Sequence, residues 1–258
     1  MGVLVAVGAA ACGEEADQAP DLPLAGEVER FDVGSDPAVV FKPEGDVEGI
    51  LIYHHGAGET IDELVELQSR STSLVGHLLE EGWAVAATAA GGDHWGSQAG
   101  IDANTALWEA LDDDLRADSV VLLGHSMGGV SSLSCIVQEC VPGIDGWIGI
   151  YPLVDQRSLV GSSIAAEALP AIEQTFGGAP PPSLIPLEQA DALAEVPMVV
   201  WASPDDEVVP METNAAELAR RVEAAGGQVT LHTASGPHGD PSHYDAEAIL
   251  DFLHSLEP

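Results

Sequence analysis

The sequence has very few basic residues. Only 7 of its 258 residues are Lys or Arg, with Lys42 the single lysine, against 43 Asp and Glu, and the formal net charge is −36. Such a field repels phosphate backbones and anionic lipid headgroups, so we expect no nucleic-acid partner. The acidic excess favours a solubility role, for example in a salty environment, over an acidic binding face.

Cysteine is also scarce, with only three residues, and no CxxC pair or spaced Cys/His set occurs. This argues against a metal site. Hydrophobic residues make up 46% of the chain, with 28 Gly and 17 Pro spread along it. That composition excludes a coiled coil, a collagen-like rod and a fully disordered chain. The length suffices for one large domain with a substantial core.

The N-terminus carries a short apolar run, residues 3–11, followed by Cys12. Nine residues are too few to span a bilayer as a helix, but they match a signal-peptide core. Residues 9–12 resemble a bacterial lipobox, whose cysteine would carry a lipid anchor. The segment departs from that pattern because it has no Lys or Arg and no Leu three residues before the cysteine. A buried N-terminal strand is the alternative.

An acidic stretch rich in Ala and Pro follows at residues 13–23 and is typical of a flexible tether. We therefore divide the chain into a signal-like segment with tether, residues 1–25, and a folded domain, residues 26–258. We expect the protein to be exported, as a periplasmic, cell-surface or secreted bacterial protein.

Cys135 and Cys140 lie on a predicted helix. Five residues apart on an ideal helix, their Cα atoms would be about 8 to 9 Å apart, too far for a disulfide. A bridge therefore requires the helix to end between them, and residues 140–143, Cys-Val-Pro-Gly, offer such a stop. An oxidising compartment would permit the bond. The sequence is equally consistent with a disulfide and with two free buried thiols.

From residue 28 onward, short apolar runs alternate with longer amphipathic ones. The first two runs read as a β-hairpin, and the later ones as buried strands separated by helices. Strand, helix, strand repeated in this way predicts a mostly parallel sheet with helices on both faces. The predicted strands are residues 28–33, 38–42, 49–54, 83–89, 119–123, 146–151, 197–202 and 228–233, and the predicted helices are 61–80, 103–115, 213–225 and 245–255.

Residues 156–195 interrupt the alternation of strands and helices. The stretch is longer than one crossover needs, and its apolar residues Ala165, Leu169, Ile172 and Phe176 have helical spacing. This favours a small cap over the carboxyl edge of the sheet. An ordinary crossover helix with a surface loop is the alternative.

The motif Gly124-His-Ser126-Met-Gly128 sits where an apolar strand ends and a helix begins. A tight strand-to-helix turn forces its serine into a strained backbone conformation, and flanking glycines avoid clashes. The serine then projects above the sheet edge at a helix N-terminus, which favours developing negative charge. We predict that Ser126 is a nucleophile rather than a capping serine.

A serine nucleophile needs a histidine base held by an acid. Strand ends converge at one edge of a parallel sheet, so both partners should follow later strands. Residues 203–210, Ser-Pro-Asp-Asp-Glu-Val-Val-Pro, follow one such strand. We assign Asp206 as the acid, with Asp205 the near alternative and Glu207 a distant one.

Residues 236–240, Gly-Pro-His-Gly-Asp, follow the last predicted strand, and we assign His238 as the base. His243, close to the start of the final helix, is the runner-up. His232 lies within a strand and fits a packing role, and His125 next to the nucleophile fits a supporting one. The remaining candidates fit surface or core positions better than a catalytic one: His54, His77, His94 and His254.

Acyl transfer also needs hydrogen-bond donors for an oxyanion. Residues 53–58, Tyr-His-His-Gly-Ala-Gly, follow the first buried strand. The backbone N–H groups of Ala57, in this loop, and of Met127, next to the nucleophile, are the natural pair. Taken alone, the loop could equally be a plain strand-to-helix turn.

Together these four motifs, in the order nucleophile, acid, histidine, resemble the α/β-hydrolase superfamily over about residues 28–257. The resemblance implies an eight-stranded, mostly parallel sheet with at most a small cap. It also implies a Ser126–Asp206–His238 triad and neither a metal nor an organic cofactor. Serine rather than aspartate at the strand-to-helix turn, the nucleophile elbow, argues against haloalkane dehalogenase or epoxide hydrolase chemistry.

We expect a serine hydrolase of the esterase or lipase type that cleaves a small-molecule or polymeric carboxylic ester through an acyl-enzyme. Trp95 and Tyr151 are predicted to line an apolar pocket. Acyl transfer to an alcohol, or peptidase activity, would use the same triad. An inactive surface-anchored binding protein is the alternative of another class, but its signature, a lost triad member, is missing.

Overall fold

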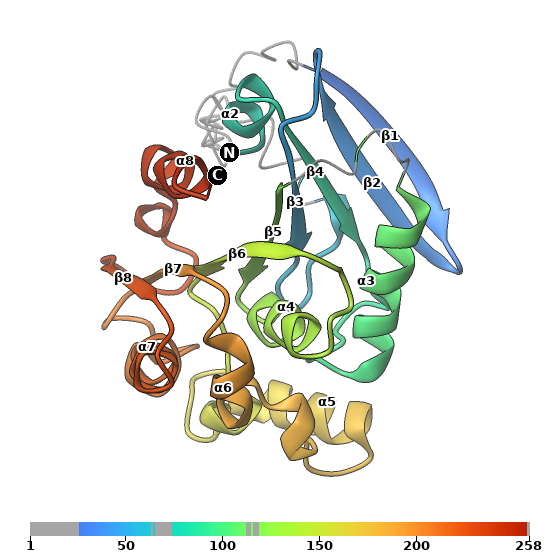
Figure 1. Cartoon of the computed structure of the whole chain (residues 1–258). Helices are drawn as coiled ribbons and strands as arrows, with labels where there is room; N and C mark the ends of the chain where they lie inside the picture. The colour runs from blue at the N-terminus through green and yellow to red at the C-terminus, as the bar shows by residue number, and fades with distance from the viewer. Residues whose placement is uncertain (1–25, 63, 65–73, 112–114, 116–118, 257–258) are drawn as a thin grey trace, which may run out of the picture.

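Eight strands form one sheet in the order β1-β2-β4-β3-β5-β6-β7-β8 (Figure 1). The computed structural model describes residues 26–62, 64, 74–111, 115 and 119–256. The β2 strand runs antiparallel to β1 and β4, and the pairs from β4 through β8 are parallel. The strands are β1 (Gly26–Val33), β2 (Asp36–Pro43), β3 (Gly49–His54), β4 (Trp83–Thr88), β5 (Ser119–His125), β6 (Ile144–Ile150), β7 (Met198–Ala202) and β8 (Val229–Thr233).

All eight predicted strands are therefore confirmed, with ends that differ by at most 2 residues. The α-helices are α2 (Leu74–Glu80), α3 (Gln98–Ala110), α4 (Gly128–Val137), α5 (Ala165–Phe176), α6 (Ala190–Leu193), α7 (Ala215–Ala224) and α8 (Ala246–His254). Of the predicted helix 61–80, much lies outside the described residues. The predicted segment 1–25, including Cys12, lies outside them entirely.

The prediction for α3 was wrong at both ends. The helix begins five residues before the predicted start, at Gln98 in place of Ala103, and ends at Ala110. Its buried face includes Ile101, Asn104 and Leu107, and the Asn104 amide donates to the Gly100 carbonyl at 2.8 Å. Gly100, a poor helix former, lies in the first turn, which is why the sequence placed the start of the helix too late.

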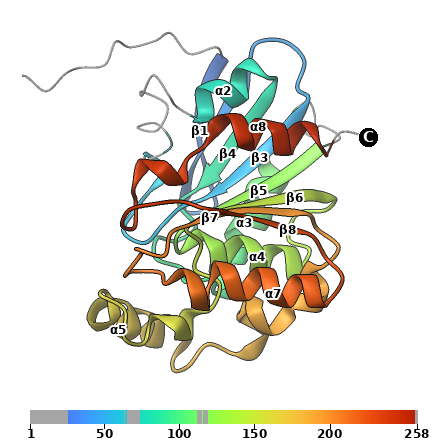
Figure 2. The ribbon, with the colours of Figure 1, turned by 90° about the vertical axis from the view of Figure 1, so that its left-hand side faces the viewer.

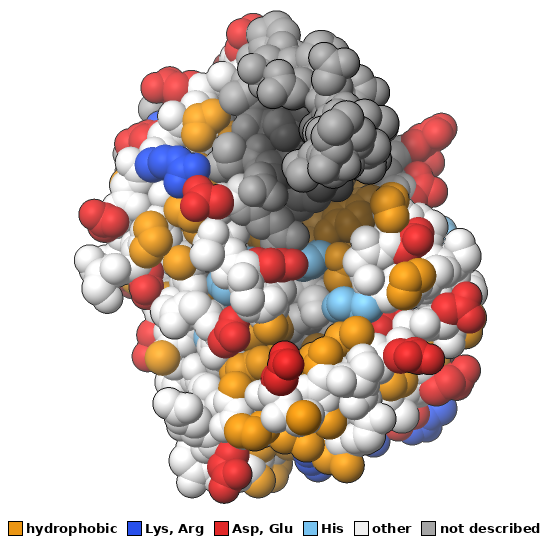
Figure 3. All heavy atoms as spheres, turned by 180° about the vertical axis from the view of Figure 1, so that it is seen from behind, with side chains coloured by type: hydrophobic (Ala, Val, Ile, Leu, Met, Phe, Trp, Pro, Cys, Tyr) orange, Lys and Arg blue, Asp and Glu red, His pale blue; other side chains and the backbone are white. Residues whose placement is uncertain are grey.

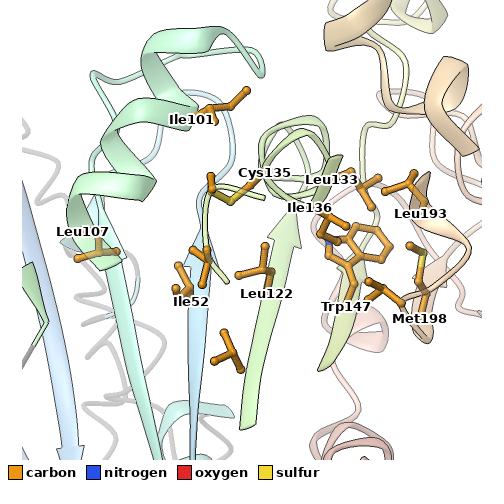
Figure 4. Close-up of a cluster of buried hydrophobic side chains, with 14 of the residues drawn as sticks. Ile52, Ile101, Leu107, Leu122, Leu133, Cys135, Ile136, Trp147, Leu193 and Met198 are labelled. Atoms are coloured by element: carbon orange, nitrogen blue, oxygen red, sulfur yellow. A yellow bond between two sulfur atoms is a disulfide. The ribbon is translucent and has the colours of Figure 1, made fainter. Parts of the chain in front are cut away.

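Alternate residues of each central strand face opposite sides of the sheet. On β3, Ile50 and Ile52 face the layer that contains α3, α4, α6 and α7, whereas Leu51 and Tyr53 face α2 and α8. Figure 2 shows α2 and α8 on one side of the sheet and α4 and α7 on the other. Figure 4 shows Ile52, Leu122 and Trp147 from three strands packed against α4 side chains such as Leu133.

The segment between β6 and β7 contains α5, α6 and three short 3₁₀ turns. Ala168 and Ile172 of α5 pack in an apolar cluster with Met127 and Trp95. The buried Gln156 amide donates to the backbone carbonyls of Trp95 at 2.9 Å and Leu184 at 3.0 Å. This segment is thus tied to the loops beside the carboxyl edge of the sheet.

Cys135 and Cys140 form a disulfide. The helix does end between them, as a bridge requires, but at Val137 and so before the stop that the sequence suggested. Glu139 then takes a left-handed conformation (φ 52°), and the Cys140 N–H donates to the Cys135 carbonyl at 3.0 Å. This turn reduces the Cα separation to 5.0 Å.

None of the helices in the described part of the chain is long and apolar enough to cross a bilayer.

The disulfide should stabilise the fold measurably. The double variant Cys135→Ala/Cys140→Ala opens the short loop that the disulfide closes and so frees the unfolded chain. We expect its unfolding free energy to fall by about 2 kcal/mol in urea titrations. Reductant should destabilise the wild type and leave the double variant unchanged. Equal midpoints for the wild type with and without reductant would mean that the thiols are free.

Candidate active site

Ser126 lies in the turn between β5 and α4, with a left-handed backbone (φ 50°). Its N–H donates to the Ile150 carbonyl at 3.1 Å, and its own carbonyl accepts from the N–H groups of Gly129 and Leu153 at 2.9 and 2.8 Å. A non-glycine residue in this conformation costs of order 1 kcal/mol or more and persists only where its surroundings hold it. Here three backbone hydrogen bonds hold it.

The two glycines of the motif allow the turn to pack closely. A Cβ on Gly128 would overlap the carbonyl oxygen of His54 at the end of β3, and one on Gly124 would overlap the Ser132 hydroxyl of α4. That hydroxyl donates to the Gly128 carbonyl at 2.8 Å and accepts from the Trp147 indole at 2.8 Å. Glycine is therefore required at positions 124 and 128, where β3, β5 and α4 meet.

His238 brings its imidazole to the serine. Its Nε2 lies 2.9 Å from Ser126 Oγ, and its Nδ1 lies 2.7 Å from Asp206 Oδ2. Because a carboxylate can only accept, Nδ1 donates to Asp206 and Nε2 is left to accept the serine O–H. The loops after β5, β7 and β8 supply the three groups.

The Asp206 carboxylate is buried and fixed on its other oxygen as well. Its Oδ1 accepts from the backbone N–H groups of Val208 and Val209 at 2.8 and 2.9 Å. The alternatives Asp205 and Glu207 are both exposed. Among the three acids of this loop, only Asp206 meets the imidazole.

The runner-up base lies elsewhere in the same neighbourhood. His243 is buried, and its Nδ1 lies 2.9 Å from the Asp240 carbonyl. Its ring packs edge-on against Tyr151, at a centroid distance of 4.9 Å. His232 lies on β8 and stacks on Trp201 at 4.7 Å. The structure brings His238 to Ser126 and gives these two histidines packing contacts.

The two predicted oxyanion donors come from different parts of the chain. Ala57 follows β3, and Met127 precedes α4. Neither backbone N–H has a hydrogen-bond acceptor among the residues that the structure describes. The role of these two N–H groups as an oxyanion hole stays a prediction.

Trp95 and Tyr151, the predicted pocket residues, are 3% and 4% exposed and have left-handed backbones (φ 48° and 34°). Trp95 packs behind Met127. The Tyr151 ring lies against the His238 ring, with 4.4 Å between centroids. Figure 3 shows histidine side chains near the middle of one face, with hydrophobic side chains gathered beside them. Pocket lining by these two residues stays a prediction.

Sequence reasoning missed one residue beside the site. Glu59 accepts at a single oxygen, Oε2, from the Gly56 N–H at 2.5 Å, and the same oxygen lies 3.0 Å from His125 Nδ1. His125 was predicted to support the elbow, but nothing identified its partner. The signal was present, because Glu59 lies three residues after Gly56, the spacing at which a side chain reaches back to a turn N–H.

Two further histidines are buried beside the loop after β3. Burial, with the nearby His55 adding to it, lowers the pKa of His54 to about 3 and holds the pKa of His94 well below its usual value. Both imidazoles are therefore neutral at physiological pH. Within the described ranges, no three His, Cys, Asp or Glu side chains converge to hold a metal ion.

Comparison with protein-family models finds no match, and neither does comparison with curated proteins. Solved structures do match over most of the chain. An esterase/lipase from an uncultured bacterium has a TM-score of 0.66 at 18% identity, over 90% of this chain and 85% of its own. The chain has the α/β-hydrolase fold.

Other neighbours with this fold include esterases, lipases and peptidases. A hormone-sensitive lipase from a metagenome library has a TM-score of 0.68 at 18% identity, over 90% of this chain and 87% of its own. Pyrococcus horikoshii acylaminoacyl peptidase has a TM-score of 0.69 at 14% identity and matches 89% of this chain. The match spans only 41% of that longer peptidase.

The buried neutral histidines should make folding stability depend on pH. An unfolded histidine takes up a proton below about pH 6.5, whereas folded His54 stays neutral down to about pH 3, so acid favours unfolding. We expect His54 to account for a loss of about 1.4 kcal/mol between pH 7.5 and 5.5.

Urea titrations at both pH values would measure this loss. His54→Gln should reduce the difference in unfolding free energy between the two pH values by about 1.4 kcal/mol. Leu133→Ala, a neutral truncation in the core, should lower stability equally at both. An unchanged pH difference in His54→Gln would contradict the assignment.

Proposed function

We propose that the chain is a serine hydrolase that cleaves carboxylic esters through an acyl-enzyme on Ser126. The observation that carries the proposal is the pair of hydrogen bonds from Ser126 Oγ to His238 Nε2, 2.9 Å, and from His238 Nδ1 to Asp206 Oδ2, 2.7 Å. A serine is a useful nucleophile only beside a base, and the base works only in the correct tautomer. Both conditions are met, which counts against an inactive binding protein.

In the first half-reaction, Ser126 Oγ attacks the ester carbonyl carbon while His238 Nε2 takes the hydroxyl proton. Asp206 holds Nδ1–H and stabilises the resulting imidazolium. The negative charge that develops on the carbonyl oxygen is stabilised by the N–H groups of Ala57 and Met127. The C–O bond then breaks, and His238 returns the proton to the departing alcohol.

In the second half-reaction, water takes the place of the alcohol. His238 accepts a proton from the water as its oxygen attacks the acyl-enzyme carbonyl, and the same N–H groups stabilise the second oxyanion. The ester bond to Ser126 Oγ breaks, the serine regains its proton from His238, and the acid is released. An acceptor alcohol in place of water would give acyl transfer, which product analysis with added alcohol detects.

Amide cleavage is the second candidate, favoured by the likeness to acylaminoacyl peptidase. The chemistry is the same, but the leaving amine must be protonated by His238 before the C–N bond breaks. Parallel assays of an aryl ester and the matching anilide separate the two. Ester turnover with no amide turnover supports the esterase.

We also propose that the protein is exported, with a lipid on Cys12 as its anchor. Support comes from the Cys135–Cys140 disulfide, because such bonds persist in oxidising compartments. Mass spectrometry of the N-terminal peptide from a bacterial membrane fraction would test the anchor. An unmodified Cys12 would contradict it.

Removing the nucleophile should abolish turnover. We expect Ser126→Ala to lower kcat for a p-nitrophenyl ester by about 10⁴-fold or more, because neither attack nor acyl transfer can proceed without Oγ. Ser134→Ala is the matched control: it removes the hydroxyl of another buried serine, on α4, and should keep near wild-type kcat. Near wild-type turnover by Ser126→Ala would refute the assignment.

The two histidine candidates can be separated by stopped-flow acylation. His238→Ala should abolish the burst of p-nitrophenol, because it removes the imidazole that is bonded to Ser126 Oγ and accepts its proton. His243→Ala should keep a burst, with its rate reduced by about tenfold at most, since its ring packs against Tyr151 and bonds to the Asp240 carbonyl rather than to Ser126. The reverse pattern would make His243 the base.

A further inference from the structure

A series of hydrogen-bonded side chains, Glu59–His125–Tyr151–Tyr244, lies beside the catalytic groups. Glu59 Oε2 lies 3.0 Å from His125 Nδ1, and His125 Nε2 makes a hydrogen bond to the Tyr151 hydroxyl. The Tyr151 hydroxyl lies 3.4 Å from that of Tyr244. This hydrogen-bonded series thus joins the loop after β3, the end of β5 and the residue after β6.

The acceptor at one end sets the direction of these hydrogen bonds. The Glu59 carboxylate can only accept, so His125 donates to it from Nδ1–H. In the neutral imidazole the other nitrogen is then an acceptor, and the Tyr151 O–H donates to Nε2. The arrangement repeats acid, imidazole and hydroxyl in the order of the triad, but with a buried tyrosine in place of an accessible nucleophile.

This hydrogen-bonded series lies next to both predicted oxyanion donors, the nucleophile and the base. Glu59 Oε2 also accepts from the N–H of Gly56, at 2.5 Å, and the next residue is Ala57. His125 immediately precedes Ser126, and Met127 follows. The Tyr151 ring also lies against the His238 ring, with 4.4 Å between ring centroids.

We propose that Glu59 is a positioning residue that aligns the two halves of the oxyanion hole. By accepting from Gly56 N–H and His125 Nδ1–H at one oxygen, it fixes the Ala57 peptide relative to the elbow that carries Met127 N–H. Tyr151 extends the same alignment to His238. The proposal rests on the proposed ester hydrolysis at Ser126.

Two features favour positioning over simple core packing. The Glu59 side chain is 28% exposed, so a carboxylate is not needed there to fill the core. Two left-handed residues also lie along this series, since Tyr151 (φ 34°) is a member of it and Ser126 (φ 50°) directly follows His125. Strained residues persist where neighbours hold them, and they gather at functional sites.

The test compares Glu59→Ala, which removes the acceptor, with Glu59→Gln, which keeps an oxygen at the same place. The substrates are a p-nitrophenyl ester and its thiono analogue, whose carbonyl sulfur is a weak hydrogen-bond acceptor and gains little from an oxyanion hole. Damage to folding or to the base slows both substrates alike. A misaligned oxyanion hole lowers the ratio of ester to thionoester kcat/KM.

We expect Glu59→Ala to lower kcat for the ester about 10²-fold with KM within twofold, the loss typical of one oxyanion donor. The ester-to-thionoester ratio should fall at least about tenfold with it. Glu59→Gln should recover kcat to within about fivefold of wild type. Tyr151→Phe, which keeps the ring but loses the hydroxyl, should lower kcat by about tenfold.

The control is Glu217→Ala, which removes a glutamate bonded to Arg220 and Arg221 on α7 and should leave both kcat and the ratio unchanged. An unchanged ratio in Glu59→Ala, or Glu59→Gln as slow as Glu59→Ala, would overturn the proposal. If Glu59→Ala does not fold, Glu59→Gln and Tyr151→Phe carry the test through the same ratio. Full ester turnover by Ser126→Ala would instead overturn the proposed function, whatever Glu59 does.

Discussion

The close packing at Gly124 and Gly128 is the constraint on which the site depends. These positions admit no side chain, because β3, β5 and α4 meet there at backbone contact. That contact holds Ser126 in its left-handed turn and places it at the edge where the loops after β7 and β8 also end. Asp206 and His238 come from those loops, so the parallel sheet itself brings three distant segments to one place.

Much of this arrangement follows from the sequence alone. Near-continuous apolar runs such as those of β3 and β5 reveal which segments are buried, and the motif at Ser126 marks the strand whose end carries the nucleophile. The chain order of Asp206 and His238 then follows from where later strands end. These features are patterns of neighbouring residues, which is why a single sequence reports them.

What the sequence did not reveal depends on contacts between distant segments. The start of α3 was missed because Gly100, a poor helix former, lies in its first turn, where the packing of Ile101 in the core holds the helix. The sequence did not decide between a disulfide and two free thiols, because the bond depends on Glu139 adopting a left-handed turn, which few non-glycine residues do. Glu59 was missed because its partner His125 lies 66 residues away.

The central claim is that Ser126 is activated by His238, and covalent labelling tests it most directly. Intact mass after treatment with a fluorophosphonate should show a single adduct on the wild type and none on Ser126→Ala. An adduct on both proteins, or on neither, would contradict the account. In the second case the histidine and acid would not activate the serine in solution, and a binding function on a hydrolase scaffold would explain the fold better.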